Sequence, residues 1–149
     1  MLTRRQFMIL NVHADDEEMF YFSFAEVNFG GQVFSGGRDP GAEPGGVRYE
    51  GDRTWVAGVP AREIADDLLA LVSSGLLVAF IRREGVRASL SLGECEAIRS
   101  FYDGYDCVTC GDHNLRYGYG PHCFEITEAG KRELQRPEYR EFARAPGLM

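Results

Sequence analysis

The sequence predicts a single α+β domain, and three observations carry that prediction. An amphipathic helix, a glycine and an apolar strand follow one another over residues 60–82. Helix signals stand near the N-terminus, and a capped helix follows an apolar run near the C-terminus. With 149 residues, of which 44% are hydrophobic, the chain has enough material for one hydrophobic core.

The stretch 60–82 organises the rest of the chain. Apolar residues recur at i, i+3, i+4 and i+7, which predicts a helix with one buried face. Pro60 suits the first helical position, and Gly75 ends the helix because glycine adopts the left-handed conformation without a Cβ penalty. Residues 76–81 then form an apolar run of strand length, before Arg82 returns the chain to water.

The N-terminal third predicts two helices. Thr3 is a cap for the first, and the acidic run 15–18 is typical of the start of the second. Residues 19–29 fit both a helical stripe and strand alternation, and we predict a helix because Gly30 and Gly31 supply a stop. The strand alternative stays open.

Residues 30–58 are rich in glycine and proline and predict an irregular loop without a phosphate-binding motif. Within this loop, residues 47–49 and 54–56 flank a polar turn and predict a small hairpin. Two later helices are indicated by their caps. Ser91 and Glu94 form a capping box before residues 93–101, and Thr127 opens a helix that must end by Pro137.

Two phrases, SSGLLVAFI and the later CFEITEAGKREL, together resemble part of a winged helix-turn-helix domain. They are similar to its third helix, first wing strand, second wing strand and following helix, and cover roughly a third of the chain. The resemblance implies one winged-helix-like domain over 1–149 with N-terminal helices. It also implies a loop insertion at 30–58, before the third helix, and a long insertion at 83–122, between the two wing strands.

The net negative charge of the chain indicates which class of partner it binds. The chain has a formal net charge of −7, which argues against a broad surface for polyanions. In the resemblance, the helix at 60–75 is the recognition helix, yet its outward residues carry one positive and three negative charges. Because winged helices also serve as protein docking domains, we expect an interaction or regulatory module with an unknown protein partner. The candidate partner-binding residues are Glu63, Asp66, Asp67, Tyr105, Tyr117 and Tyr119.

The alternative is a DNA-binding regulator of the winged-helix type. A compact basic cluster stands where the wing would begin, and wings often touch phosphates. The candidate nucleic-acid residues are Arg62, Arg82, Arg83 and Arg87. The oligomeric state is open, because aromatic residues of the second segment also suit a homo-oligomer.

The cysteines raise the question of a metal. Cys107 and Cys110 resemble half of a zinc knuckle, Cys123 is a candidate third ligand, and His113 or His122 is a candidate fourth. A second CxxC or an HxxxH is missing, so we expect reduced thiols and no cofactor, with structural zinc and a redox CxxC as alternatives.

No spacing of the histidines predicts an enzyme. His13, His113 and His122 match neither HExxH nor another arrangement that sets a base against a nucleophile, and His13 is expected to be exposed. No signal peptide is visible, and no apolar run reaches the roughly 20 residues that span a bilayer. The expectation is a cytoplasmic protein without membrane contact.

Overall fold

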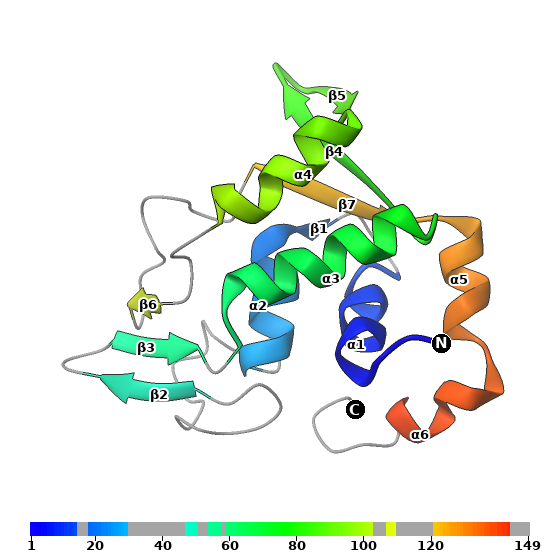
Figure 1. The fold of residues 1–149 in the computed structure, drawn as a ribbon, viewed down its shortest axis with the longest axis horizontal. Coiled ribbons are helices and arrows are strands. Elements are labelled where there is room, and N and C mark those ends of the chain that lie inside the picture. Colours follow the sequence, from blue (N-terminus) through cyan, green and yellow to red (C-terminus); the bar gives the residue numbers. More distant parts are fainter. Residues whose placement is uncertain are drawn as a thin grey trace.

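The computed structural model describes residues 1–14, 18–29, 47–50, 54–57, 59–102, 107–109 and 121–143, which form a mixture of helices and strands (Figure 1). The predicted α+β class is confirmed. Within these ranges no helix has the length and apolar character needed to cross a membrane. The elements are α1 (Arg4–Val12), β1 (Glu18–Met19), α2 (Phe20–Phe29), β2 (Val47–Glu50), β3 (Thr54–Ala57), α3 (Ala61–Ser73), β4 (Leu77–Arg83), β5 (Val86–Ser89), α4 (Leu92–Phe101), β6 (Cys107–Thr109), β7 (His122–Ile126), α5 (Glu128–Leu134), a 3₁₀ turn (Pro137–Tyr139) and α6 (Arg140–Ala143).

Two antiparallel sheets organise the strands. The larger sheet has the order β1-β7-β4-β5, so strands distant in sequence lie side by side. Its longest pairing joins β4 to β7, from Leu77 opposite Ile126 to Ile81 opposite His122. The second sheet has the order β2-β3-β6, and its β2–β3 pair is the hairpin predicted in the glycine-rich region.

The core lies between the helices and one face of the larger sheet. Leu10, Phe24 and Leu68 come from α1, α2 and α3, and each is fully buried. Leu77 of β4 and Phe124 of β7 meet them from the sheet. Burying a side chain of this size contributes about 1.5–3 kcal/mol, so the shared cluster is the main reason that the helices stay on the sheet.

Local capping signals place most helix ends as predicted. The side-chain oxygens of Thr3, Ser91 and Thr127 each accept the amide hydrogen bond of the residue three positions later. Gly75 has φ +77°, which is the left-handed conformation expected after the end of α3. Pro60 is the N-cap of α3 and does not occupy its first turn, so the expected start is one residue too early.

The second segment begins differently from the prediction. The expected helix start at 15–18 is wrong for Glu18, because this residue pairs with Phe124 in the sheet. The helix begins only at Phe20, and for residues 20–29 the helical alternative is correct. A capping pattern alone does not show that a neighbouring strand is available for main-chain pairing.

The region after β4 begins with a strand pair that the sequence did not predict. The strand continues to Arg83, two residues beyond the predicted end, and turns back at once into β5. Glu84 and Gly85 have φ of 53° and 78°, which is typical of a two-residue type I′ hairpin turn. The inserted residues therefore first extend the sheet, and then form α4.

A substitution at Gly130 measures how closely α5 packs on the sheet. A Cβ at this position would lie 2.3 Å from the carbonyl oxygen of Leu76 and 2.6 Å from Cγ1 of Ile126. We expect Gly130→Ala to lower the free energy of unfolding by about 1–3 kcal/mol, because overpacking outweighs the better helix propensity of alanine. Chemical denaturation measures the difference.

Gly93 in α4 is the matched control. A Cβ there would meet nothing within 4 Å, so Gly93→Ala should leave the free energy of unfolding unchanged or raise it by up to about 1 kcal/mol. Equal stabilisation by both substitutions would contradict the close approach of α5.

Candidate functional site

The β4–β5 hairpin brings the predicted arginines together. Arg82 lies directly opposite Arg87 in the register of the two strands, and Arg83 lies opposite Val86 beside the turn. All three arginines are exposed. Since side chains alternate along a strand, Arg82 and Arg87 share one face of the sheet, and Arg83 lies on the other.

The two arginines that share a face pack on one aromatic ring. The guanidinium carbon of Arg87 lies 3.8 Å from the ring centroid of Phe80, and that of Arg82 lies 5.5 Å from it. Arg87 also pairs with Glu125 of β7 at 3.1 Å. On the opposite face, Arg83 lies 3.9 Å from Glu94 of α4. The hairpin thus presents exposed arginines, two of which place their guanidinium groups over one ring and two of which form ion pairs.

Asp67 is not part of an exposed acidic face. It is buried in α3, where Nε of Arg5 donates a hydrogen bond to its carboxylate and Nε2 of Gln6 lies 3.4 Å from the other oxygen. The prediction that Asp67 points outward is wrong. Position 67 lies one turn after Ile64 and one turn before Leu71, which are both buried, and the carboxylate is accommodated there because Arg5 of α1 pairs with it.

The other acidic residues of α3 are also paired. Oε1 of Glu63 lies 3.8 Å from Nη1 of Arg5 of α1, and Oδ1 of Asp66 lies 3.0 Å from Nε of Arg99 of α4. Helix α4 packs along α3 (Figure 1). Its buried residues Cys95 and Ile98 belong to the same core cluster as the apolar face of α3. Arg62 remains exposed near the start of α3.

The remaining predicted residues are placed only in part. Tyr105, Cys110, His113, Tyr117 and Tyr119 lie outside the described residues.

The described cysteine candidates lie in different sheets. Cys107 begins β6 of the smaller sheet, whereas Cys123 is buried in β7 of the larger one. Over the described ranges, no group of three or more His, Cys, Asp or Glu side chains is arranged to hold a metal. Structural zinc stays a prediction.

His122 and Tyr102 form a pair that joins α4 to the sheet. The hydroxyl of Tyr102 lies 2.9 Å from Nδ1 of His122, and partial burial lowers the pKa of His122 while nearby Glu94 opposes the change. The ring of Tyr102 also stacks on Phe20 of α2, with a centroid distance of 3.7 Å. This arrangement fixes the C-terminal end of α4, and sequence reasoning did not single it out.

His13 is buried and links the end of α1 to β7 and α2 by hydrogen bonds. The expectation that it is exposed is wrong. Its Nδ1 lies 3.0 Å from the carbonyl oxygen of Phe124, and its Nε2 lies 2.9 Å from Oγ of Ser23. Because a carbonyl only accepts, Nδ1 donates and Nε2 accepts the hydroxyl hydrogen of Ser23. Burial lowers the pKa of His13 to about 4. The sequence did contain an indication of this burial. His13 lies three residues after Leu10, and this spacing puts it on the buried side of α1.

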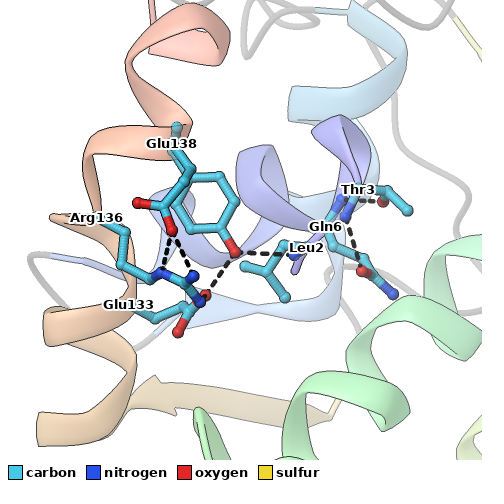
Figure 2. A network of polar contacts seen from close by, with 7 residues as sticks. Leu2, Thr3, Gln6, Glu133, Arg136 and Glu138 are labelled. Atoms are coloured by element: carbon cyan, nitrogen blue, oxygen red, sulfur yellow. Dashed lines mark hydrogen bonds and ion pairs between the residues drawn. The ribbon is translucent and has the colours of Figure 1, made fainter.

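A further polar network joins the two ends of the described chain (Figure 2). The hydroxyl of Tyr139 accepts the amide hydrogen of Leu2 at 2.8 Å and donates to Glu133. Arg136 pairs with both Glu133 and Glu138. A pocket of about 350 Å³ lies beside this network. Its lining consists of Met1, Leu2, Gln6, Ala70, Leu71, Ser74, Leu76, Glu133 and Arg136.

The charges at this pocket are already matched within the chain. Arg136 directs its guanidinium nitrogens to Glu133 and Glu138, and Glu133 also accepts from Tyr139. The network therefore explains how the segment after α5 is held against the residues that precede α1, and it does not by itself point to a ligand.

His13 makes stability depend on pH. Its folded pKa of about 4 lies below the ordinary value of 6.5, so the unfolded chain binds more protons between these values. Its contribution to stability is complete above pH 6.5 and is lost as the pH falls toward 4, with a slope of up to about 1.4 kcal/mol per pH unit.

We expect His13→Asn to reduce this slope in urea unfolding at pH 7, 6 and 5. The asparagine amide can still donate to Phe124 but does not titrate, and at pH 7 the lost bond to Ser23 should cost about 1–3 kcal/mol. Ser23→Ala is the control, because it removes the same hydrogen bond and keeps the histidine. An unchanged slope in His13→Asn would show that another group sets the pH dependence.

Comparisons of this chain with protein-family models, with curated proteins and with solved structures gave no match. The resemblance to winged-helix domains stays a prediction from the two sequence phrases.

Proposed function

We propose that this chain is a winged-helix-like protein-interaction or regulatory module, without enzymatic activity and with a cytoplasmic location. The order of elements supports this proposal, because α3, β4, β7 and α5 stand where the resemblance puts the third helix, the two wing strands and the following helix. The antiparallel pairing of β4 with β7 also suits two wing strands. Both described histidines are engaged in hydrogen bonds that join elements of the fold.

The observation that carries the proposal is the pairing of the acidic residues on the exposed side of α3. Glu63 and Asp66 are exposed there, and they pair with Arg5 of α1 and Arg99 of α4. In the resemblance α3 is the helix that would enter the major groove, where its exposed side would approach bases and phosphates. Carboxylates on this side repel phosphates, and their arginine partners belong to the fold itself, so this arrangement favours a protein partner.

The candidate partner surface shifts accordingly. Glu63, Asp66 and Asp67 all have ion-pair partners within the chain, and Asp67 is buried. Exposed apolar side chains instead stand on the hairpin and on α4, where Val86 is 67% and Leu92 is 74% exposed. Apolar side chains of this kind are typical of the centre of a protein interface. We therefore assign partner contact to the hairpin and the outer side of α4.

A second candidate function is DNA binding through the hairpin. The observation that favours it is the exposed position of Arg82, Arg83 and Arg87 at one end of the sheet. Arginines at such a position can contact phosphates without any helix in a groove.

Fluorescence anisotropy with a random-sequence duplex and with the DNA upstream of the coding region separates these functions. We expect no binding to either duplex at low salt, and no difference between the wild type and the triple variant Arg82→Ala, Arg83→Ala, Arg87→Ala. Salt-sensitive binding that this variant weakens, but Arg132→Ala on α5 does not, would instead establish the DNA-binding function.

Partner capture tests the protein-interaction function directly. The tagged chain should retain a protein that Leu92→Glu loses, because a buried charge at an apolar interface costs more than the contact contributes. Arg132→Glu on α5 is the matched control and should retain the same protein. Equal retention by both variants would place the partner surface elsewhere.

A further inference from the structure

Strand β5 is an open edge of the larger sheet. Among the strands that the structure describes, the order β1-β7-β4-β5 gives it a neighbour on one side only. The two-residue turn makes Arg83 and Val86 a hydrogen-bonded pair, and the bond from the amide of Leu90 to the carbonyl of Ala79 continues the alternation. Val86 and Ala88 therefore bond to β4, whereas the N–H and C=O groups of Arg87 and Ser89 point away from the sheet.

The outward groups of this edge are accessible. Val86, Arg87 and Ser89 are exposed, and Ala88 is half-buried. Among the described residues, the main-chain groups of Arg87 and Ser89 have no hydrogen-bond partner. The strand contains no proline, and its small residues Ala88 and Ser89 let another chain approach closely. Such an edge is a template on which an extended segment adds as a further strand.

The charges around the edge select the kind of segment. Residues 82–89 carry three arginines and one glutamate, a net charge of +2, in a chain whose net charge is −7. Arg82 and Arg87 lie directly opposite one another, and like charges in this position cost about 0.2–1 kcal/mol. Both guanidinium groups are held over Phe80, and Glu125 lies beside Arg87 on the β7 side. A carboxylate on the outer side of β5 and opposite Arg87 would share the face of this arginine, whose guanidinium reaches over Phe80 to Glu125 of β7 in the structure.

We propose that the β5 edge binds an extended acidic segment of a partner protein as an additional antiparallel strand. The main chain of the segment pairs with the N–H and C=O groups of Arg87 and Ser89, and the residue opposite Arg87 carries a carboxylate on the same face as this arginine. This inference rests on the proposed protein-interaction function and names its partner chemistry. A nucleic acid would satisfy the arginines but has no peptide main chain to form the ladder.

Amide hydrogen exchange measured by NMR tests the ladder itself. The probe is a blocked synthetic octapeptide of alternating valine and glutamate. At saturating peptide we expect exchange of the Arg87 and Ser89 amides to slow by about tenfold or more. The amides of Val86 and Ala88 already bond to β4, so their exchange should change little and serves as the internal reference.

A proline substitution separates main-chain pairing from charge. Ser89→Pro removes one outward N–H, and proline is tolerated on an edge strand where that group faces solvent. We expect it to weaken peptide binding about tenfold or more. Thermal unfolding checks that the fold is retained, and Ser89→Ala should bind like the wild type. Arg87→Ala should also weaken binding, whereas Arg132→Ala should not.

The outcomes distinguish this inference from the proposed function. Unprotected Arg87 and Ser89 amides, or equal peptide binding by Ser89→Pro and Ser89→Ala, overturn the β5-edge inference. If duplex DNA is also not bound, the interaction module itself stands with another surface. Duplex binding that depends on the arginines and not on Ser89→Pro overturns both. Protection without peptide that grows with protein concentration assigns the edge to a second copy of the chain and overturns the acidic segment.

Discussion

The pairing of β7 with β4 is the constraint on which the rest of the structure depends. It joins residues 77–81 to residues 122–126 and places β7 in the middle of the larger sheet. Phe124 of β7 then pairs with Glu18 in β1, accepts the hydrogen bond of buried His13 and fills the core between the helices. Since α5 follows β7 directly, the same pairing sets the helix at Gly130 against Leu76. The core packing, the hydrogen bond of His13 and the position of α5 thus all depend on β7.

The insertion between β4 and β7 places a further helix beside α3. Helix α4 packs along α3, and its own apolar residues join the common core. The other side of α3 stays exposed at Arg62, Glu63 and Asp66. The acidic residues of α3 then neutralise arginines of α1 and α4, as Asp67 does for Arg5 and Asp66 for Arg99. The negative charge of α3, which argued against DNA in the sequence, is therefore largely paired with arginines of the same chain.

The hairpin differs, because its arginines stay exposed even though Arg83 and Arg87 pair with Glu94 and Glu125. Arg82 and Arg87 lie opposite one another in spite of their like charge, and half of the main-chain groups of β5 point away from β4. Packing on Phe80 and the ion pair with Glu125 hold these side chains without burying them. Features that cost stability and remain exposed are typical of binding surfaces. This contrast is why the proposals concern the hairpin rather than α3.

Local signals in the sequence determined the elements. The caps at Thr3, Ser91 and Thr127, the stop at Gly75, and the 47–57 hairpin all depend on residues close in the chain, and each is found in the structure. The grouping of three arginines was also readable, because a hairpin keeps its residues close in sequence. The resemblance to winged-helix domains remains a prediction.

Only the tertiary structure decided which residues are accessible. Asp67 reads as one more acidic residue on a helix, and its burial depends on Arg5, which is distant in the sequence. His13 reads as exposed beside acidic residues, but β7 supplies the carbonyl that makes its burial favourable. The packing of α4 on α3 and the open edge of β5 likewise follow from strand order, which no local pattern contains. Burial and pairing are properties of long-range contacts, and a carboxylate or an imidazole is tolerated in a core only where such a contact satisfies it.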